Sequence, residues 1–441
     1  MAVDLGATSG RYAAGWIDGD RIVYEVVEQV PNKPIEKDGH VFWDVEALFA
    51  LCQRAWSHAE QRFDRSTVGI DSWGVDHGFL FEGSTPKAVA YRDLSHQAMF
   101  ERMADHRDRL YAITGIQHQP FNTVYQLACR AEEDPTLKQG TWLLMPDLMG
   151  FLLTGVRHCE YTMASTTQLM GLDDQWCVEA FEVIKWPVPA LPISMPGKII
   201  APGGRVSLAS VGSHDTASAV FGLGPLKGHQ AFLNVGTWSL LGTVLDKPLL
   251  ASQAFTNERT VDGRVRYLAN IPGFYVVNRV HEELGIKESV GEWLRSAALQ
   301  RRPGGDASAE PYADLTSQEF FNPTSMCEAL AHDNAPKTDA EWAALALGSL
   351  IETTARQLDE LARLTKRNFK EIRVSGGGSR SEVFCQGLAD RCRVPVIAGP
   401  EEATLLGNLG MQFVASGDVS STEEASELIG RSFAVRRYEP A

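Results

Sequence analysis

The first thirty residues alternate between apolar and polar positions, and glycines stand where the alternation breaks. The alternating segments are 2–5, 11–17 and 21–30, separated by glycine-containing turns at 6–10 and 18–20. A period of two is typical of a half-buried strand, and glycine adopts the conformations that tight turns need. The pattern predicts a β-meander at the start of the chain.

A helical pattern follows the meander. Apolar residues at positions 45, 48, 49, 52 and 56 share one face of a helix, and Asp44 stands where an N-cap is expected. The next apolar segment, 67–70, predicts a short strand. It ends at a polar cluster, Asp71-Ser72-Trp73-Gly74-Val75-Asp76.

The second half of the chain opens in the same way as the first. Residues 230–234 predict a strand, Gly236-Thr237 a turn, and 238–244 a second strand. By structural analogy, two such strand–turn–strand units indicate a duplicated domain that faces itself across a cleft.

The C-terminal part alternates helices with strands. Thr338 and Glu341 have the spacing of a capping box, which starts a long helix. The predicted elements after that helix are a strand over 371–375, a helix over 381–391, a strand over 394–398 and a helix over 401–415. This alternation indicates α/β architecture.

Prolines and glycines crowd residues 187–204, where neither a helical nor a strand period is sustained. Such stretches commonly separate domains. We therefore predict a boundary near residue 205, with an N-terminal lobe over 1–205 and a C-terminal lobe over 206–441.

Length and composition support two globular domains. The chain has 441 residues, of which 44% are hydrophobic and 22% charged. A single core rarely serves more than about 250 residues. The formal net charge of −15 argues against nucleic acid as a partner, because a phosphate backbone binds to basic surfaces.

The sequence has no apolar run of membrane-spanning length and no leader pattern at its start, so we expect a cytoplasmic protein with no membrane partner. Its seven cysteines are scattered and show no metal-ligand spacing. We expect them to be reduced thiols of the core.

Two glycine-containing turns are candidate phosphate sites. In the first, Asp4 at a strand end precedes the small residues of Gly6-Ala7-Thr8-Ser9-Gly10, whose backbone N–H groups can approach a phosphate closely. The segment lacks the spacing of a Walker P-loop. The second turn contains Gly236 and Thr237. Either turn could equally be an ordinary hairpin.

The triple glycine at 376–378 lies between a predicted strand and a predicted helix. Its spacing and late position do not fit a Rossmann fingerprint. We favour adenosine binding against the exposed backbone, and a tight structural turn is the alternative.

Asp215 lies between the strand predicted over 206–211 and a helix that begins near Thr216. Phosphoryl transfer to an alcohol needs a base within hydrogen-bond reach of the hydroxyl, and an ionised carboxylate can serve. The alternative is that Asp215 only caps its helix. The neighbouring His214 would suit a hydrolase, but no G-x-S-x-G nucleophile motif accompanies it.

Eight segments occur in the order found in rhamnulokinases, which are FGGY-type carbohydrate kinases. They are VDLGATSGR, GIDSWGVD, TGIQHQPFNTVYQL, LLMPD, EYTMASTTQL, SHDTASAV, GTWSLLG and IAGPEEATLLGN. The chain resembles this family over nearly its whole length. The resemblance implies two actin-like (RNase H-like) α/β lobes with an interlobe cleft. It also implies transfer of the ATP γ-phosphate to the 1-hydroxyl of a ketose, L-rhamnulose.

The resemblance also implies roles for individual residues, with Asp215 as the catalytic base. The expected nucleotide-binding residues are Ala7, Thr8, Ser9, Gly10 and Arg11 in the first phosphate loop, Thr237 in the second, Gly376 and Gly377 on the adenine side, and Asn278. The expected sugar-contacting residues are Gly74, His214, Asp215, Thr216 and Asn270. The family uses Mg²⁺, which Asp4 is expected to orient through water. Asp71 and Asp76 could hold sugar hydroxyls or order their loop.

The chain departs from the family pattern at His77, at Leu94-Ser95 and at Asn234-Val235, and it begins three residues before Asp4, which predicts a short first strand. We expect the first two departures on the sugar side. One hydroxyl contact can change specificity by orders of magnitude, so L-fuculose or a pentulose is the alternative substrate.

A non-catalytic sugar or nucleotide sensor and a hydrolase are more distant alternatives. We expect a monomer or a homodimer.

Overall fold

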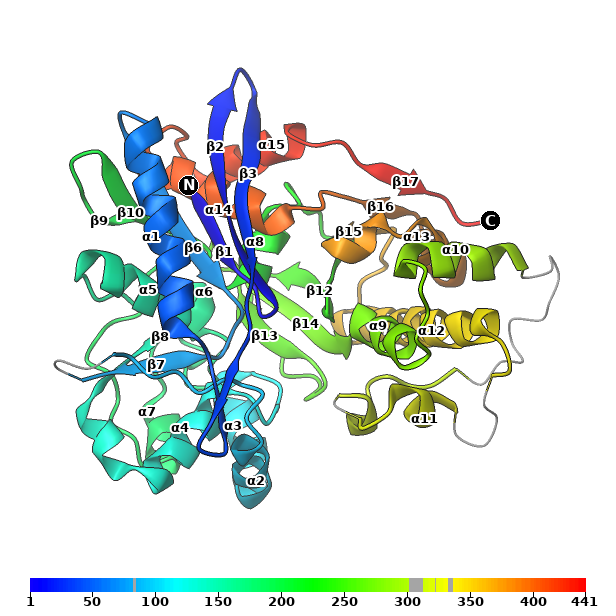
Figure 1. The fold of residues 1–441 in the computed structure, drawn as a ribbon, viewed down its shortest axis with the longest axis horizontal. Coiled ribbons are helices and arrows are strands. Elements are labelled where there is room, and N and C mark those ends of the chain that lie inside the picture. The colour runs from blue at the N-terminus through cyan, green and yellow to red at the C-terminus, as the bar shows by residue number, and fades with distance from the viewer. Residues whose placement is uncertain (82–84, 301–311, 322, 332–335) are drawn as a thin grey trace. The chain divides into compact units, whose positions relative to one another are not determined.

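The computed structural model describes residues 1–81, 85–300, 312–321, 323–331 and 336–441, and its chain forms two compact units (Figure 1). The first unit contains Met1–Pro225, Val244–Tyr267 and Ala403–Ser432. The second contains Leu226–Thr243, Leu268–Glu402 and Phe433–Ala441. Both contain helices and strands, which confirms the predicted α/β class.

A six-stranded sheet forms the centre of the first unit. Its order is β3 (Arg21–Pro31), β2 (Ser9–Asp18), β1 (Ala2–Leu5), β6 (Ser66–Ser72), β10 (Val206–Ser210) and β9 (Lys198–Ala201). Strand β6 pairs in parallel with both β1 and β10, and the outer pairings of the sheet are antiparallel. The first three strands are the predicted meander.

Helices cover both faces of this sheet. On one face, Val3, Leu5, Val68 and Ile70 share a buried apolar cluster with α1 (Val45–Arg62). Since successive side chains of a strand point to opposite faces, Asp4, Gly69 and Asp71 lie on the other face. There they meet α14 (Ala403–Ser416): Gly69 lies against Asn408 and Gln412. The alternation of the strands therefore sends two carboxylates towards α14.

The second sheet has the order β13 (Thr256–Arg259), β14 (Val265–Pro272), β12 (Trp238–Leu245), β11 (Gln230–Val235), β15 (Glu371–Ser375), β16 (Val396–Ala398) and β17 (Arg436–Tyr438). Strands β11, β15, β16 and β17 belong to the second unit, and the chain passes from one unit to the other within β12 and β14. Strand β11 runs parallel to β15, with Asn234 opposite Ser375.

The remaining elements surround these sheets. The other helices of the first unit are α2 (Ser95–Arg102), α3 (Arg107–Thr114), α4 (Thr123–Glu133), α5 (Met145–Thr154), α6 (Tyr161–Ala164), α7 (Val178–Val183), α8 (Asp215–Phe221) and α15 (Thr422–Arg431). The first unit also has two two-stranded sheets, β4 (Ile35–Lys37) with β5 (His40–Phe42), and β7 (His77–Leu80) with β8 (Thr141–Leu144). The second unit has α9 (Phe274–Glu283), α10 (Val290–Gln300), α11 (Met326–Ala331), α12 (Asp339–Thr365) and α13 (Glu382–Cys392).

The compact units do not divide where the sequence suggested, near residue 205. Strand β10 follows that position, yet it pairs with β6 inside the first sheet. Helices α14 and α15 also belong to the first unit, although they lie near the end of the chain. The proline- and glycine-rich residues 187–204 are therefore interior to the first unit and do not link the two units.

Local signals predicted the elements closely. Asp44 accepts a hydrogen bond from the backbone N–H of Ala47 as the N-cap of α1. Thr338 and Glu341 form the capping box of α12. All seven cysteines are free. Among the helices of the described residues, none has both the length and the hydropathy to cross a membrane.

Helices α8 and α14 approach each other so closely that only glycine fits at two positions. A Cβ atom on Gly222, which ends α8, would lie 1.9 Å from the carbonyl oxygen of Ala403, and a Cβ atom on Gly407 would lie 1.9 Å from that of Ser218. The contact is therefore made backbone to backbone, and α14 fixes the position of α8.

We expect Gly407→Ala to lower the free energy of unfolding by about 1–3 kcal/mol, because the added methyl group forces the two helices apart. Gly204→Ala is the control, since a Cβ atom there meets nothing within 4 Å. Urea unfolding of both variants measures the difference. Equal stability of the two variants would contradict the close contact.

Candidate functional site

Three neighbouring parallel strands of the first sheet, β1, β6 and β10, end at one edge. The loops that follow them contain the turn after Leu5, the segment Trp73-Gly74, and the segment 211–214. The backbone N–H of Ser72 donates to the carbonyl oxygen of Ser213 at 2.9 Å, which ties the last two loops together. Ligand sites of open α/β sheets commonly form outside the carboxyl ends of such strands.

Asp215 is the first residue of α8, and His214 is the N-cap. The alternative that Asp215 caps its helix is therefore not observed. The Asp215 Oδ1 atom accepts a hydrogen bond from the Thr216 hydroxyl at 3.0 Å, and 30% of the Asp215 side chain is exposed. Burial of the carboxyl raises its pKa above the ordinary value, and Asp4 adds to the rise. A partly exposed carboxylate with a raised pKa is suited to accept a proton.

His214 is held by a buried ion pair that sequence reasoning did not identify. Its Nδ1 atom lies 3.0 Å from Arg266 Nη2 and 3.3 Å from Glu258 Oε2. Arginine can only donate and a carboxylate can only accept, so Nδ1 lies between a donor and an acceptor that hold the ring in place. The Nε2 atom lies 3.5 Å from Asp215 Oδ1. The pair thus orients the imidazole ring so that Nε2 lies on the side of Asp215.

Arg266 and Glu258 compensate each other's charge. Their side chains are 0% and 9% exposed, and Arg266 Nη2 lies 3.1 Å from Glu258 Oε2. Burial alone would raise the pKa of Glu258, but Arg266 and His214 lower it below the ordinary value. Neither residue belongs to a recognisable sequence motif, because β13 and β14 bring them beside His214 only in the folded chain.

Glu160 fixes the loop before Asp215. This fully buried carboxylate accepts hydrogen bonds from the N–H groups of Thr162, Met163 and Ser213 and from the Thr162 hydroxyl. Thr162 in turn accepts from the His214 N–H at 3.2 Å. Burial raises the pKa of Glu160 to about 7. Sequence reasoning missed this residue, although it lies in the EYTMASTTQL segment.

The structure brings most predicted sugar-contacting residues together. A Cβ atom on Gly74 would lie 3.2 Å from His214 Nε2 and 3.2 Å from Thr166 Cγ2, so Gly74 leaves room beside the imidazole. Thr216 follows Asp215 at the start of α8. Asn270 lies in β14 and is counted with the second unit. Thr166 is an addition that the sequence did not suggest.

Asp76 orders its loop. Its buried carboxylate accepts hydrogen bonds from the indole nitrogens of Trp43 and Trp73, from the Gln126 amide and from the Tyr91 backbone N–H. These four donors stabilise the charged carboxylate, but burial outweighs them and raises its pKa to about 6.

The departures at His77 and Leu94 differ in their surroundings. The His77 ring is buried in edge-on contact with Phe79 and Trp142, and burial lowers its pKa to about 3. The Leu94 side chain is 77% exposed. His77 is thus a neutral part of the core, and Leu94 belongs to the surface.

Asp4 and Asp71 are adjacent in the parallel pairing of β1 with β6. Arg11 donates to Asp4 Oδ2 from Nη2 at 2.8 Å and from Nε at 3.0 Å. Asp71 accepts from Asn408 through Oδ2, but its buried Oδ1 atom has no hydrogen-bond partner among the described residues. Burial, and next the charge of Asp4, raise the pKa of Asp71 well above the ordinary value.

These carboxylates fit a hydrated magnesium ion. An unsatisfied buried carboxylate oxygen beside a second carboxylate is stabilised by a cation. Within the described ranges, no three His, Cys, Asp or Glu side chains are grouped so that they could hold a metal directly. A magnesium ion at this place would therefore keep several of its water ligands.

The first predicted phosphate loop is only partly a loop. The turn is closed by the Gly6 N–H, which donates to the Ser9 carbonyl at 2.9 Å, and Thr8 is exposed. Ala7 and Ser9 are half-buried in the same turn. Gly10 and Arg11 belong to β2, where Gly10 is buried and Arg11 pairs with Asp4.

In the second unit, two predicted nucleotide segments follow the adjacent parallel strands β11 and β15. The exposed turn Gly236-Thr237 follows β11. Gly376 follows β15 with a φ of 78°, and a Cβ atom there would lie 2.7 Å from the Val235 carbonyl oxygen. Gly377 is exposed and begins a short 3₁₀ helix, Gly377–Arg380.

The Gly236-Thr237 turn also contacts the start of α9, which bears the exposed Asn278. The N–H groups of Gly273 and Phe274 donate to the carbonyl oxygens of Thr237 and Gly236 at 2.9 and 3.0 Å. The backbone of this turn is therefore fixed while its surface stays open.

Two models of one protein family match the chain. The N-terminal domain of the FGGY family of carbohydrate kinases matches residues 1–202, and the C-terminal domain of that family matches residues 231–416. The chain is also similar to whole proteins. It is 33% identical over 466 residues to a rhamnulokinase of Halalkalibacterium halodurans, covering 99% of this chain and 98% of the relative. It is 30% identical over 472 residues to a rhamnulokinase of Bacillus subtilis, covering 100% and 95%.

Solved structures share the fold. A ligand-bound xylulose kinase from Lactobacillus acidophilus superposes with a TM-score of 0.81 at 19% identity, covering 100% of this chain and 93% of that one. A Plasmodium falciparum glycerol kinase with ADP superposes with a TM-score of 0.77 at 13% identity, covering 100% and 94%. Identities this low establish the architecture alone.

We expect Arg266→Met to lower the free energy of unfolding by about 3–5 kcal/mol, because it leaves the Glu258 carboxylate buried without its cation. The double variant Glu258→Gln/Arg266→Met should recover part of this loss, since it buries no unpaired charge. Urea unfolding of both proteins provides the comparison. A double variant no more stable than the single one would show that the pair is not compensating.

Proposed function

We propose that this chain, which belongs to the FGGY family of carbohydrate kinases, transfers the γ-phosphate of ATP to the 1-hydroxyl of L-rhamnulose. Membership of the family makes it an ATP-dependent sugar kinase. The choice of L-rhamnulose is supported by rhamnulokinases that are 30–34% identical over essentially the whole chain.

One observation carries the proposed mechanism: Asp215 is partly exposed at the carboxyl edge of the first sheet, beside the oriented His214. We propose that the Asp215 carboxylate accepts the proton of the sugar hydroxyl as that oxygen attacks the γ-phosphorus, which expels ADP. His214 Nε2 forms a hydrogen bond with a sugar oxygen. Gly74 and Thr216 complete the pocket on this side, and Asn270 contributes from β14.

Each unit offers backbone groups suited to a nucleotide. The turn at 6–9 in the first unit and the turn at 236–237 in the second each have N–H groups that a phosphate could contact. Gly376 and Gly377 provide a surface without side chains for the adenosine, and Asn278 lies on the neighbouring helix α9. With ATP, Mg²⁺ supplies positive charge for the phosphate oxygens, and Asp4 with Asp71 would hold it through water.

The ion pairs Arg11–Asp4 and Arg266–Glu258 have different roles in this proposal. Arg11 keeps the Asp4 carboxylate in place and so supports the metal site; it is not itself assigned to a phosphate. Arg266, through Glu258 and His214, positions the sugar. Another ketose, such as L-fuculose or a pentulose, is the alternative substrate, because the parts that act on ATP would be the same. The cytoplasmic location and a monomeric or homodimeric state stay predictions.

We expect kcat/KM to fall as the pH is lowered through the raised pKa of Asp215, because only the ionised carboxylate accepts a proton. The acidic limb should lie above the ordinary aspartate value of about 4. Asp215→Asn should bind ATP and lose turnover by a factor of about 10² or more at every pH. Both follow from initial rates across a pH series. Near-normal turnover of Asp215→Asn would exclude Asp215 as the base.

Coupled ADP release with Mg²⁺-ATP tests the substrate. The panel is L-rhamnulose, L-fuculose, L-ribulose, L- and D-xylulose and glycerol, and we expect the highest kcat/KM with L-rhamnulose. A clear preference for another sugar would reject L-rhamnulose and leave the kinase mechanism in place. Phosphate release without any sugar would instead indicate a hydrolase.

A further inference from the structure

The first unit contains a second cavity whose lining includes none of the residues assigned above. Its volume is about 420 Å³, and it lies between β8, the start of α5, the segment 157–159 and the segment 186–191. This volume is within the range of small-molecule pockets, roughly 300–1,000 Å³. The proline-rich stretch that the sequence singled out as a candidate linker thus forms a wall of this cavity.

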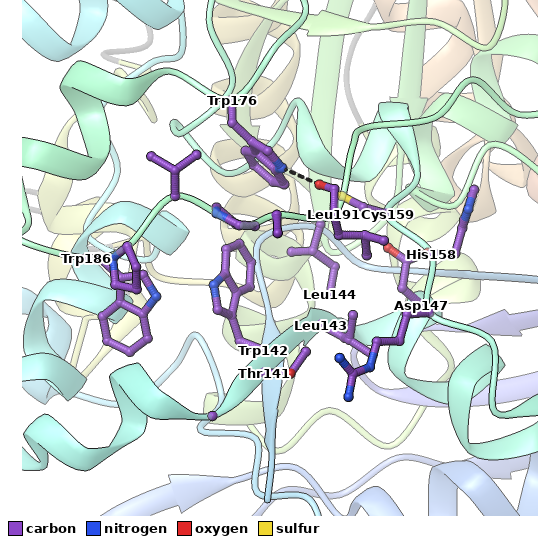
Figure 2. A pocket seen from close by; sticks show the side chains of 16 residues that line it. Thr141, Trp142, Leu143, Leu144, Asp147, His158, Cys159, Trp176, Trp186 and Leu191 are labelled. Carbon is purple, nitrogen blue, oxygen red and sulfur yellow. Dashed lines mark hydrogen bonds between the residues drawn. The ribbon is translucent and has the colours of Figure 1, made fainter.

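Three tryptophans line one side of the cavity, as Figure 2 shows. The rings of Trp142 and Trp176 lie 5.8 Å apart at 59°. The Trp176 indole donates to the Leu191 carbonyl at 3.0 Å, which fixes that ring against the proline-rich wall. Within the described part of the chain, the indole nitrogens of Trp142 and Trp186 have no hydrogen-bond acceptor, so both N–H groups are available to an occupant.

Polar groups gather on the opposite side, where Figure 2 places Asp147 and His158. Asp147 accepts the Glu160 N–H through Oδ2, and His158 Nε2 lies 3.1 Å from the Ser210 hydroxyl. Burial, aided by Lys198, lowers the pKa of His158 to about 4, so this ring is neutral at pH 7. Arg157 is exposed and adds a cation to the lining.

We propose that this cavity is a second carbohydrate-binding site, separate from the catalytic one. The aliphatic C–H face of a sugar ring packs well on the electron-rich face of an indole. Its hydroxyls need donors and acceptors, which Asp147, His158 and the free indole N–H groups provide. A purely apolar ligand would cover the polar atoms of Asp147 and His158 without using their remaining hydrogen-bonding capacity, at a desolvation cost. Arg157 allows the sugar to bear a phosphate.

The cavity adjoins the loop that precedes the catalytic base. Asp147 and His158 also line a small neighbouring cavity of about 10 Å³, roughly the space of one water, which reaches Ser213. Asp147 contacts Glu160, and Glu160 holds the Ser213 N–H at 3.2 Å. An occupant that hydrogen-bonds Asp147 is therefore three contacts away from Ser213, so its binding is able to affect turnover.

Calorimetric titration of the full chain with L-rhamnulose and with L-rhamnulose 1-phosphate tests this proposal. We expect two binding events per chain for at least one of the two probes. Binding of both sugars equally would assign the site to the sugar ring, and preference for the phosphorylated sugar would assign Arg157 to the phosphate. One event per chain for both probes would overturn the proposal.

A matched pair of variants locates the second event. Ala190 is exposed and lines the cavity, so Ala190→Phe fills it and Ala190→Ser does not. We expect Ala190→Phe to weaken the second event at least tenfold while Ala190→Ser keeps it, with turnover in the absence of added sugar phosphate unchanged in both. The comparison is made with the same probe in each variant, so it does not depend on which ketose is the substrate. Equal binding of the probe by the two variants would contradict a site in this cavity, and loss of both binding events in Ala190→Phe would contradict two separate sites.

Discussion

The backbone contact between α8 and α14 is the constraint on which the candidate site depends. Gly222 and Gly407 let carbonyl groups of the opposing helix come within the distance that a Cβ atom would occupy. Through this contact, α14 fixes the helix that begins with Asp215. Helix α14 also donates two hydrogen bonds, from Asn408 to the Asp71 carboxylate and from Gln412 to the carbonyl oxygen of Met1. A segment near the end of the chain thus fixes both the base and the carboxylate edge of the first sheet.

Four buried carboxylates of the first unit are compensated in different ways. Glu258 has an arginine beside it, Asp76 and Glu160 have four hydrogen-bond donors each, and Asp71 has one donor and one unsatisfied oxygen. Burying a carboxylate costs several kcal/mol unless it is paired or hydrogen-bonded. By this measure Asp71 is the least satisfied of the four. A position where the protein alone leaves a carboxylate uncompensated is where a cation contributes most, which supports assigning the metal to Asp4 and Asp71.

Local sequence signals predicted the helix caps and strands that are set by residues close together in the chain. The Asp44 N-cap, the Thr338 capping box and the strand over 371–375 are set by short-range hydrogen bonding and by side-chain alternation, and they were found where expected. Asp215, His214 and Gly74 could be placed near one another because the resemblance named them. Glu258, Arg266 and Glu160 could not be, because their role arises from pairings with the loop at 213–214, which lies far from them in the chain. The predicted boundary near residue 205 rests on local composition alone: prolines signal irregular backbone, and irregular backbone can line a cavity as well as join two domains.

The two carboxyl groups between the cavity and the catalytic loop are not equivalent, because they accept different numbers of hydrogen bonds. Asp147 and Glu160 are both buried, and burial raises both pKa values, with Glu160 raising that of Asp147 further. Glu160 accepts from four donors, which stabilises its ionised form, whereas Asp147 accepts from one, the backbone N–H of Glu160. The loop of Ser213 is therefore held by the better satisfied of the two carboxyl groups. Asp147, with a single donor, keeps hydrogen-bonding capacity for an occupant of the cavity.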